Sequence, residues 1–295
     1  MTPPHFAGRN RITVVVLTHN RSAELCRSLE QLLAQPEPPP VIVVDNGSTD
    51  GTAGRVNARF PQVKLVRAES NLGAAGRNLG VGHVRTPYVA FSDDDTWWAP
   101  GALQKAADLL DGHPRIAVLN ARIAVGPGAQ ADPACMTMAE SPLDRVAGVG
   151  PMLTGFMAGA VAMRTSVFRE AGGYWRAFFI GGEEALLAMD ILDAGWRIVY
   201  APALRVHHWP SQLRDSALRN RLIARNAIWT AWLRLPWRMA WRQTRLSLNQ
   251  LPCRNLRWRV IGDTLRGMAA VLRKRRVLQP GTSSLIERVW RHEAR

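Results

Sequence analysis

Three adjacent aspartates, Asp93, Asp94 and Asp95, are the residues of this chain best suited to chemistry. They follow an apolar run that is predicted as a buried strand, and a helix is predicted to begin a few residues later. Neighbouring carboxylates repel one another, and a strand end gives no structural reason for three of them. Hard divalent cations such as Mg²⁺ and Mn²⁺ prefer oxygen ligands and often share them with substrate phosphates. The alternative is a solvated turn whose acids complement the dipole of the next helix.

Two further polar clusters also lie at the ends of predicted elements. Asp45 follows a buried strand and could accept hydrogen bonds from a base or a ribose, while Gly47 and Ser48 allow a tight turn and cap the next helix. Glu183 and Glu184 follow two glycines at a predicted helix start, where a carboxylate could act as general base on a hydroxyl. Taken alone, each cluster is also compatible with a capping turn or with surface acids at a helix start.

The first 120 residues alternate between the periods of buried strands and of amphipathic helices. This alternation predicts an α/β fold with a mostly parallel, doubly wound sheet, in which ligands bind beyond the carboxyl ends of the strands. The polar clusters fall at those ends. Ser22 is expected to cap the first helix. The predicted strands are residues 12–17, 41–44, 63–66, 88–91 and 116–120, and the predicted helices are 22–35, one ending near 59, one ending near 84, and 100–110.

The second part of the chain has a less regular pattern. Residues 121–150 are rich in Gly, Ala and Pro, which predicts a loop or an irregular insertion. Three prolines divide the end of the chain, so a set of shorter helices is expected there. Further strands are predicted at residues 156–163 and 197–201, and further helices at 165–171, 183–194 and 213–233.

The positive charge of the chain is concentrated at its C-terminal end. The formal net charge is +15, and residues 211–295 hold 19 of the 38 Lys and Arg but only 4 of the 23 Asp and Glu. The same segment holds 6 of the 11 tryptophans. Arg and Trp on amphipathic helices are typical of a segment that lies on an anionic membrane surface. The alternatives are nucleic-acid binding, for which no known module is present, and a helical cap that packs on the rest of the chain.

Other features indicate the compartment. The three cysteines are far apart, so neither a metal-type pair nor a disulfide framework is expected. The N-terminus lacks the layout of a signal peptide, and no stretch approaches the ~18–20 apolar residues of a membrane-spanning helix. We therefore expect a cytoplasmic protein that is neither secreted nor integral to a bilayer, and that is peripheral at the inner face of the cell membrane.

Five segments, taken in order, resemble family 2 glycosyltransferases of the GT-A fold, which are inverting enzymes that use nucleoside-diphosphate sugars. The resemblance covers about residues 11–210 and implies a Rossmann-like α/β core; the basic helical region beyond it is predicted as a C-terminal appendage from its own composition and pattern. The segments are VVVLTHNR (14–21), VVDNGSTDGT (43–52), NLGAAGRNLG (71–80), YVAFSDDDTWWAPGAL (88–103) and FFIGGEEALLAMDILDAGWRIVYAPALRVHH (178–208).

The resemblance implies roles for residues by their position in these segments. Asp93 and Asp95 fill the acidic places of the family's DxD motif, with Asp95 as the expected direct ligand of Mg²⁺ or Mn²⁺. His208 matches a histidine near the metal and the diphosphate, and His207 is its alternative. The residues implied to bind the nucleotide part of the donor are Thr18, Asn20, Arg21, Asp45, Asn71, Gly73, Arg77 and Asp94.

Glu184 matches the catalytic base of the family's Glu-Asp pair. The usual Asp is a Glu here, so the base could be either Glu183 or Glu184. Asp190 stands where an arginine is common, which puts an acceptor or phosphate contact from that position in question. The implied reaction is a single displacement at the anomeric carbon, with a metal at the leaving phosphate and a carboxylate that takes the proton of the acceptor hydroxyl.

The sequence therefore predicts residues 1–120 as the nucleotide-sugar-binding half of the core, 121–212 as the acceptor-binding and catalytic-base half, and 213–295 as the basic helical region. The expected function is transfer of a sugar from a UDP- or dTDP-type donor to a glycan or lipid-linked acceptor in surface polysaccharide or glycolipid assembly. A nucleotidyltransferase is the alternative enzyme, although no Gly-rich phosphate loop follows the first strand. A nucleic-acid- or membrane-binding protein without catalysis is the alternative outside enzymes.

Overall fold

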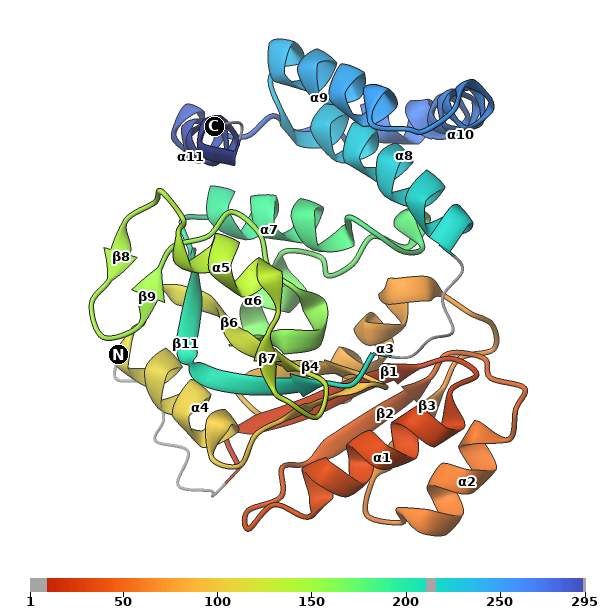
Figure 1. Ribbon diagram of the computed structural model, residues 1–295, viewed down its shortest axis with the longest axis vertical. Helices are drawn as coiled ribbons and strands as arrows, with labels where there is room; N and C mark the ends of the chain where they lie inside the picture. The colour runs from red at the N-terminus through yellow and green to blue at the C-terminus, as the bar shows by residue number, and fades with distance from the viewer. Residues whose placement is uncertain (1–9, 211–215, 294–295) are drawn as a thin grey trace.

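The computed structural model describes residues 10–210 and 216–293, which form an α/β core and a C-terminal group of helices (Figure 1). A nine-stranded sheet lies at the centre of the core, in the order β3-β2-β1-β4-β10-β6-β11-β5 with β7 paired to β6. Strands β8 (Arg145–Val146) and β9 (Gly150–Pro151) form a separate pair. The strands of the large sheet are β1 (Ile12–Thr18), β2 (Val41–Asp45), β3 (Lys64–Arg67), β4 (Tyr88–Asp93), β5 (Thr96–Trp98), β6 (Ile116–Val125), β7 (Gln130–Ala131), β10 (Val161–Arg164) and β11 (Arg197–His208).

The N-terminal half of the sheet is parallel, as predicted. β1 lies between β2 and β4 and is parallel to both, and β3 is parallel to β2. Val14, Val15 and Val16 of β1 and Val43 and Val44 of β2 are fully buried. Continuous runs of this kind are typical of parallel strands that helices cover on both faces. The α/β class predicted from the alternation of periods is therefore confirmed.

The other half of the sheet is mixed. β10 is inserted antiparallel between β4 and β6, while β11 runs parallel to β6 and pairs antiparallel with β5 near its end. The register of β11 against β6 shifts between Ala201 and Arg205. An irregularity of this kind bends a strand and re-aims the side chains beyond it. The bend brings His207 and His208 beside Trp97 and Thr96, directly after the acidic triplet.

The C-terminal region is a layer of helices that packs on the core through α7 (Figure 1). α8 contacts α7, α9 and α10 pack on α8, and α11 contacts α7. The core helices are α1 (Ser22–Leu33), α2 (Thr52–Arg59), α3 (Gly76–His83), α4 (Ala102–Gly112), α5 (Pro133–Ala139), α6 (Thr165–Glu170) and α7 (Glu183–Asp193); the C-terminal helices are α8 (Ser216–Arg234), α9 (Trp237–Asn249), α10 (Arg254–Arg273) and α11 (Pro280–Glu293).

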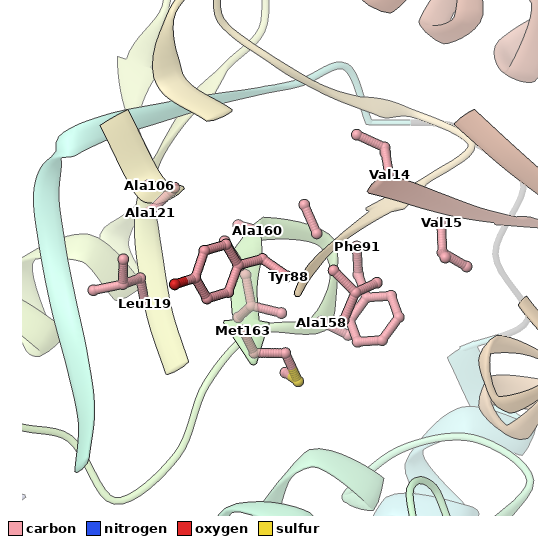
Figure 2. Packing of buried hydrophobic residues seen from close by; sticks show 14 of the residues in the cluster. Val14, Val15, Tyr88, Phe91, Ala106, Leu119, Ala121, Ala158, Ala160 and Met163 are labelled. Atoms are coloured by element: carbon pink, nitrogen blue, oxygen red, sulfur yellow. The ribbon is translucent and has the colours of Figure 1, made fainter. Parts of the chain in front are cut away.

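The main apolar core fills the space between the sheet and its helices. Figure 2 shows Val14, Phe91, Leu119 and Met163 from four adjacent strands, packed close together. Phe91 also makes an edge contact with Phe168 of α6, with ring centroids 5.4 Å apart. Burying a side chain of this size contributes roughly 1.5–3 kcal/mol to folding. This packing holds the strand ends, and hence the loops that follow them, in fixed relative positions.

Two segments differ in type from the prediction. The strand expected at residues 156–163 begins only at Val161, because Ala158–Ala160 form a 3₁₀ turn and the Met157 N–H donates to Asn120 Oδ1 at 2.7 Å. Residues 121–150 are not a simple loop. β6 continues to Val125 beside β11, and α5 begins where Asp132 accepts a hydrogen bond from the Ala134 N–H at 2.9 Å.

Two predicted helix caps are wrong. Ser22 is the first residue of α1 rather than its cap, and its hydroxyl has no hydrogen-bond partner among the described residues. Asp50 accepts from the Ser22 N–H at 3.3 Å. Asp50 also accepts from the Thr52 N–H at 3.1 Å, and the N-cap position of α2 is Gly51, so Ser48 does not cap this helix. Ser48 instead accepts from the Asn20 N–H at 2.9 Å.

At the C-terminal end, the prolines separate helices as predicted, although α10 is 20 residues long rather than short. The predicted helix start at Leu213, the boundary at 212/213 and the N-terminal residues 1–9 lie outside the described residues. All three cysteines are unpaired. No helix in the described ranges combines the length and the hydropathy that a bilayer crossing requires.

Candidate active site

Polar residues from three neighbouring strands meet at one edge of the sheet. Thr18 at the end of β1 is in register with Asp45 at the end of β2, and Leu17 is in register with Asp93 at the end of β4. The carboxyl ends of parallel strands face the same edge, so the loops that follow them lie side by side. The structure thus brings together the polar clusters that the sequence places after separate strands.

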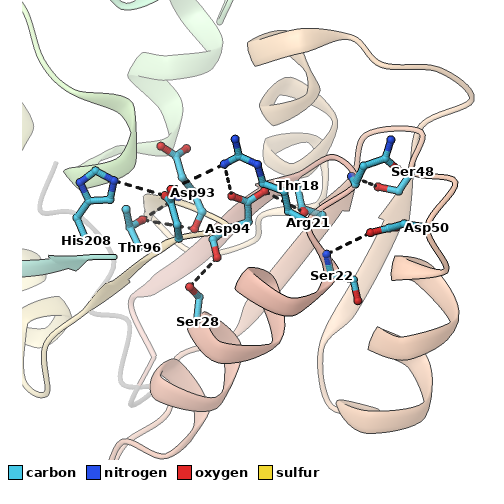
Figure 3. A network of polar contacts seen from close by, with 12 residues as sticks. Thr18, Arg21, Ser22, Ser28, Ser48, Asp50, Asp93, Asp94, Thr96 and His208 are labelled. Atoms are coloured by element: carbon cyan, nitrogen blue, oxygen red, sulfur yellow. Dashed lines mark hydrogen bonds and ion pairs between the residues drawn. The ribbon is translucent and has the colours of Figure 1, made fainter. Parts of the chain in front are cut away.

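The first two aspartates of the triplet have different partners, and Figure 3 shows those of Asp94. Asp93 forms an ion pair with Arg77, whose side chain is almost fully buried. Asp94 accepts a hydrogen bond from Thr18 Oγ1 at 3.1 Å and another from Arg21 Nη1 at 3.2 Å. Thr18, Arg21 and Asp94, predicted to bind the nucleotide part of the donor, therefore form one connected group.

The third aspartate, Asp95, lies near the end of β11, where Figure 3 shows His208 beside the triplet. Its Oδ1 lies 3.7 Å from Nε2 of His208, and its Oδ2 lies 3.8 Å from Nη1 of Arg21. The other histidine, His207, stacks on Trp97 with ring centroids 5.5 Å apart. Successive residues of a strand point to opposite faces, so His208 and not His207 is the histidine beside the triplet.

The triplet carries more negative charge than its surroundings favour. Burial, with smaller contributions from Asp93 and Asp95, raises the pKa of Asp94 to about 7 against the lowering effect of Arg21. Carboxylates that share one site cannot all ionise without cost unless positive charge is near. A cation bound at the triplet would supply that charge.

A divalent cation fits these residues when its coordination is shared with a ligand. No three His, Cys, Asp or Glu side chains within residues 10–210 and 216–293 are grouped so that they could hold a metal by themselves. Asp95 offers carboxylate oxygens, His208 offers a ring nitrogen beside them, and Asp93 is 42% exposed although it is paired with Arg77. Mg²⁺ usually binds to one or two carboxylates and takes its remaining ligands from waters and phosphates. The predicted metal residues fit that pattern.

β2 ends with a buried carboxylate, Asp45, one oxygen of which accepts no hydrogen bond from the described residues. Asp45 is fully buried, and its Oδ1 accepts from the Ser48 N–H at 2.9 Å. Its Oδ2 makes no hydrogen bond with the described residues, although Arg67 Nε lies 3.4 Å away. A buried carboxylate oxygen normally accepts at least one hydrogen bond. Asp45 is thus suited to accept one from a ligand, as predicted for a base.

Asn46 is absent from the predicted site residues, yet it holds two of them. Its Nδ2 donates to Asn71 Oδ1 at 2.9 Å and to the Gly73 carbonyl at 3.0 Å, and its Oδ1 accepts from the Leu72 N–H at 3.0 Å. Asn71 Oδ1 also accepts from the Gly73 N–H at 2.8 Å. The sequence signal for Asn46 is its place beside Asp45, directly after a buried strand.

Asn20 connects the loops after β1 and β2. Its Oδ1 accepts from the Thr49 N–H at 2.8 Å, and its own N–H donates to Ser48 Oγ. Its φ is +54°, in the left-handed region that residues other than glycine seldom adopt. Such residues cluster at functional sites, where the surrounding structure holds them in place. The position of Asn20 is compatible with the nucleotide role that was predicted.

The two glutamates begin α7, where negative charge suits the helix dipole. Glu183 is 5% exposed, and its Oε2 has no hydrogen-bond partner in the part of the chain that the structure describes. Glu184 is more exposed. Burial raises the pKa of Glu183, and burial together with the neighbouring Glu183 raises the pKa of Glu184 to about 8. Glu184 thus has the environment of a general base that works near neutral pH.

Arg77 lies between the two acidic clusters. It pairs with Asp93, its guanidinium lies 5.8 Å from the ring centroid of Tyr174, and its charge lowers the pKa of both Glu183 and Glu184. Burial lowers the pKa of Arg77 itself, but the surrounding anions, Asp93 first, raise it above its ordinary value. Arg77 therefore keeps its positive charge, and the predicted contact with the donor remains a prediction.

Comparison with known proteins agrees with this arrangement. The family model described as glycosyl transferase family 2 matches residues 13–172, which is more than half of the chain. The N-acetylglucosaminyl-diphospho-decaprenol L-rhamnosyltransferase of Mycobacterium tuberculosis is 28% identical over 234 residues, which cover 67% of this chain and 75% of that protein. The pre-mycofactocin glycosyltransferase of the same organism is 30% identical over 224 residues, or 72% of this chain and 46% of that protein.

Solved structures share the fold. The mannosyltransferase PcManGT from Pyrobaculum calidifontis, in complex with GDP-Man and Mn²⁺, aligns with a TM-score of 0.61 at 19% identity and covers 98% of this chain and 82% of its own. S. aureus TarS 1–349 in complex with UDP-GlcNAc aligns with a TM-score of 0.58 at 17% identity, over 89% of this chain and 90% of its own. The protein is therefore a member of glycosyltransferase family 2, with the GT-A fold that its sequence predicts.

Proposed function

We propose that the protein is an inverting glycosyltransferase that moves a sugar from a nucleoside-diphosphate donor, of UDP or dTDP type, to an acceptor hydroxyl with the help of Mg²⁺ or Mn²⁺. The main observation in support of this proposal is that the acidic triplet and the Glu183–Glu184 pair lie on either side of one buried arginine, Arg77. The solved structure of PcManGT with GDP-Man and Mn²⁺ supports the class of donor and of metal.

The residues of the triplet would hold the diphosphate end of the donor. Asp95 and His208 would bind the cation, which as a Lewis acid supplies charge neutralisation at the departing phosphate. Asp94 would stay fixed by Thr18 and Arg21, so that its position does not change with the donor. On the nucleotide side, Asp45 Oδ2, which makes no hydrogen bond with the described residues, would accept a hydrogen bond from the base. The loop that contains Asn71 and Gly73 would lie along the ribose and diphosphate.

Of the two glutamates, we assign Glu184 as the general base. A base must reach the acceptor hydroxyl, and Glu184 is partly exposed whereas Glu183 is buried. Glu183 would act on it indirectly, because its charge opposes ionisation of Glu184 and so makes the Glu184 carboxylate more basic. The hydroxyl then attacks the anomeric carbon on the face opposite the diphosphate, and one displacement inverts the configuration.

The acceptor that we propose is a lipid-linked glycan in surface polysaccharide or glycolipid assembly. The name of the rhamnosyltransferase relative specifies an acceptor linked to decaprenol through a diphosphate. In this division of the chain, residues 1–120 would bind the donor, residues 121–212 would bind the acceptor and provide the base, and residues 213–295 would bring the enzyme to the membrane.

An outward stripe on α10 supports peripheral binding at the cytoplasmic face of a membrane. Trp258, Leu265 and Leu272 are spaced by seven residues, so they lie on one face of the helix, and they are 64%, 66% and 47% exposed. Exposed arginines, Arg259 and Arg273 among them, flank the stripe. Apolar side chains between cations match the interface of an anionic bilayer.

The donor proposal is tested by binding of UDP, GDP and dTDP with and without Mn²⁺, measured by titration calorimetry on the full chain. We expect one of the three to bind with Mn²⁺ and to lose that affinity when EDTA is added, and the matching sugar nucleotide to be consumed. Asp144→Ala, at an acid that is 85% exposed, is the control that should leave binding unchanged. If none of the three nucleotides bound in a metal-dependent way, the proposal would be wrong.

The membrane proposal is tested by sedimentation with phosphatidylglycerol and with phosphatidylcholine vesicles. We expect the wild type to sediment with the anionic vesicles and the double variant Trp258→Ser, Leu265→Ser to bind at least about 100-fold more weakly, since each of the two buried side chains is worth roughly 1.5–3 kcal/mol. The control is Met136→Ser. Met136 is also 65% exposed, but it lies on α5, which belongs to the α/β core and not to the C-terminal helices. Equal sedimentation of the double variant and the wild type would exclude this surface.

A further inference from the structure

The loop that leads into the two glutamates has an unusual backbone. Phe179 has φ +65° and ψ −70°, and Gly181 and Gly182 have φ +86° and +85°. α7 begins with Glu183 directly after them. A non-glycine residue in such a conformation costs of order 1–3 kcal/mol and persists only where the surroundings hold it. The position of the glutamates therefore depends on what holds residues 178–182.

One side chain of the C-terminal region contacts this loop at three points. Asn226 of α8 is fully buried, and its Nδ2 donates to the carbonyl of Phe178 at 3.0 Å, to that of Ile180 at 3.1 Å and to that of Gly181. A Cβ at Gly182 would lie 3.3 Å from the Cβ of Asn226. α8 thus lies directly against the loop. The side-chain amide of Asn226 donates hydrogen bonds to loop carbonyls that have no partner in a helix or a sheet.

The orientation of this amide is fixed from its other side. Asn226 Oδ1 accepts from Arg225 Nε at 3.0 Å and from Nη2 at 2.8 Å. The same guanidinium donates to the carbonyls of Ala177 at 3.2 Å and Phe178 at 2.8 Å, and it lies 4.3 Å from the ring centroid of Trp229. The oxygen of an amide cannot donate, so only this orientation satisfies the carbonyls on one side and the guanidinium on the other.

The opposite side of the loop contacts the proposed donor site. The carbonyl of Phe179 accepts from the Ala74 N–H at 2.6 Å. A Cβ at Gly73 would lie 1.8 Å from that carbonyl oxygen, and the φ of Gly73 is +60°, so only glycine fits there. Gly73 belongs to the segment that Asn46 holds. The loop thus lies between the nucleotide side of the site and α8.

Ion pairs hold α8 in place against α7. Arg234 Nε and Nη2 donate to the two carboxylate oxygens of Asp190 at 2.6 and 2.9 Å, a bidentate pair that fixes orientation. Arg276 also pairs with Asp190 at 2.7 Å and with Asp193 at 2.9 Å. Asp190, which stands where the family commonly has an arginine, is thus engaged by the C-terminal helices. Glu183 and Asn226 therefore belong to elements that cannot shift independently.

We propose that Asn226 is a positioning residue for the Glu183–Glu184 pair, so that α8 is part of the active site rather than only a link to the membrane. This proposal rests on the assignment of Glu184 as the base. Without the amide, the loop loses its three-point support and the glutamates move relative to the donor, whose own contacts do not involve Asn226. The chemical step should then suffer while donor binding does not.

The test compares Asn226→Ala with Asn220→Ala, which changes an exposed asparagine of the same helix. The donor affinity is measured with Mn²⁺ and the nucleoside diphosphate that the wild type binds, and the rate is the consumption of the matching sugar nucleotide as a function of pH. For Asn226→Ala we expect a fall in kcat of about 100-fold, the loss typical of a displaced catalytic group. Its donor affinity should stay within about threefold of the wild type, and its pH profile should shift. Asn220→Ala should match the wild type in all three measurements.

A second variant keeps the proposal testable if Asn226→Ala does not fold. Arg225→Ala leaves the Nδ2 donors in place but removes the hydrogen bonds to Oδ1 and those that Arg225 itself donates to the Ala177 and Phe178 carbonyls, so a smaller fall in kcat, about tenfold, is expected with unchanged donor affinity. A folded variant at either position with wild-type kcat and pH profile would overturn the positioning role. A wild type that binds no nucleoside diphosphate and consumes no sugar nucleotide would instead refute the proposed function, so the two failures are distinguishable.

Discussion

The two acidic clusters of the site hold the same chemical group in opposite settings. The Asp93–Asp95 triplet contacts two guanidiniums and an imidazole, and Asp93 is its most solvent-exposed member. The Glu183–Glu184 pair is supported by a single buried cation, Arg77, and Oε2 of Glu183 has no hydrogen-bond partner among the described residues. The triplet thus has two guanidiniums that offset part of its negative charge and a carboxylate beside an imidazole that suits a shared cation, whereas the glutamate pair is suited to accept a proton near neutral pH.

The triplet should give the largest effect. Asp95→Ala removes the carboxylate beside His208, and with it the expected site of the cation. We expect sugar-nucleotide consumption to fall on the order of 1000-fold or more, because a metal at a leaving phosphate contributes several kcal/mol. Mn²⁺-dependent nucleotide binding should be lost as well, while circular dichroism remains unchanged. Survival of either activity near the wild-type level would refute the metal role of Asp95.

The glutamate pair should lose chemistry without losing the donor. Glu184→Gln keeps the shape of the side chain but cannot take a proton, so we expect a fall in kcat between about 100- and 10,000-fold with donor affinity unchanged. Glu183→Gln should be milder, since that residue is buried and acts through its charge. The comparison is made by steady-state kinetics on both variants. The reverse order of effects would assign the base to Glu183 instead.

The pH dependence of the rate should report the glutamate pair. The pKa of Glu184 is raised to about 8, and the carboxylate is the form that accepts a proton, so kcat should rise about tenfold per pH unit below 8 and then level off. The unfolding free energy depends on pH in the opposite direction to kcat. A raised pKa in the folded protein stabilises the fold most at low pH, so the contribution of Glu184 to the unfolding free energy falls as the pH rises through 8. A pH-independent kcat between pH 6 and 8 would contradict this assignment.

The fold could be predicted largely from the sequence, because its information is local. Buried strands such as Val14–Leu17 show continuous apolar runs, and the polar clusters follow them directly. The orientation of β10 could not be predicted, since a short apolar run is the same in a parallel and an antiparallel strand. The irregularity of β11 that brings His208 to Asp95 depends on pairing with two other strands, which no local pattern contains.

For the site, the sequence indicates the residues but not their partners. Asp93 and Arg77 are 16 residues apart, and their ion pair follows from the packing of α3 on β1 and β2, because β1 is the strand beside β4. Asn226 lies about 45 residues beyond the loop it holds and carries no motif. In the sequence, Asn226 is only a polar residue on a helix that is otherwise rich in Arg and apolar residues. Such a pattern predicts a solvent-exposed side chain. Contacts between distant segments decide these roles, and a motif search cannot find them.

Arg77 is the residue whose change should have the smallest effect on the maximal rate, yet it joins both clusters. Its charge lowers the pKa of Glu183 and Glu184 while it pairs with Asp93. In Arg77→Met the glutamates lose that charge, so their pKa rises further and the increase of kcat moves to higher pH, with a plateau within about tenfold of the wild type. The unfolding free energy should fall by about 1.5–3 kcal/mol, the range for a hydrogen bond to a charged group, because Asp93 is 42% exposed and water can solvate it once Arg77 is gone. Arg77→Lys keeps the charge and should restore most of the pH profile, although a lysine cannot reproduce the planar contacts of the guanidinium. If the pH profile of Arg77→Met coincided with that of the wild type, the charge of Arg77 would not influence Glu184, and the electrostatic link between the two clusters would be refuted.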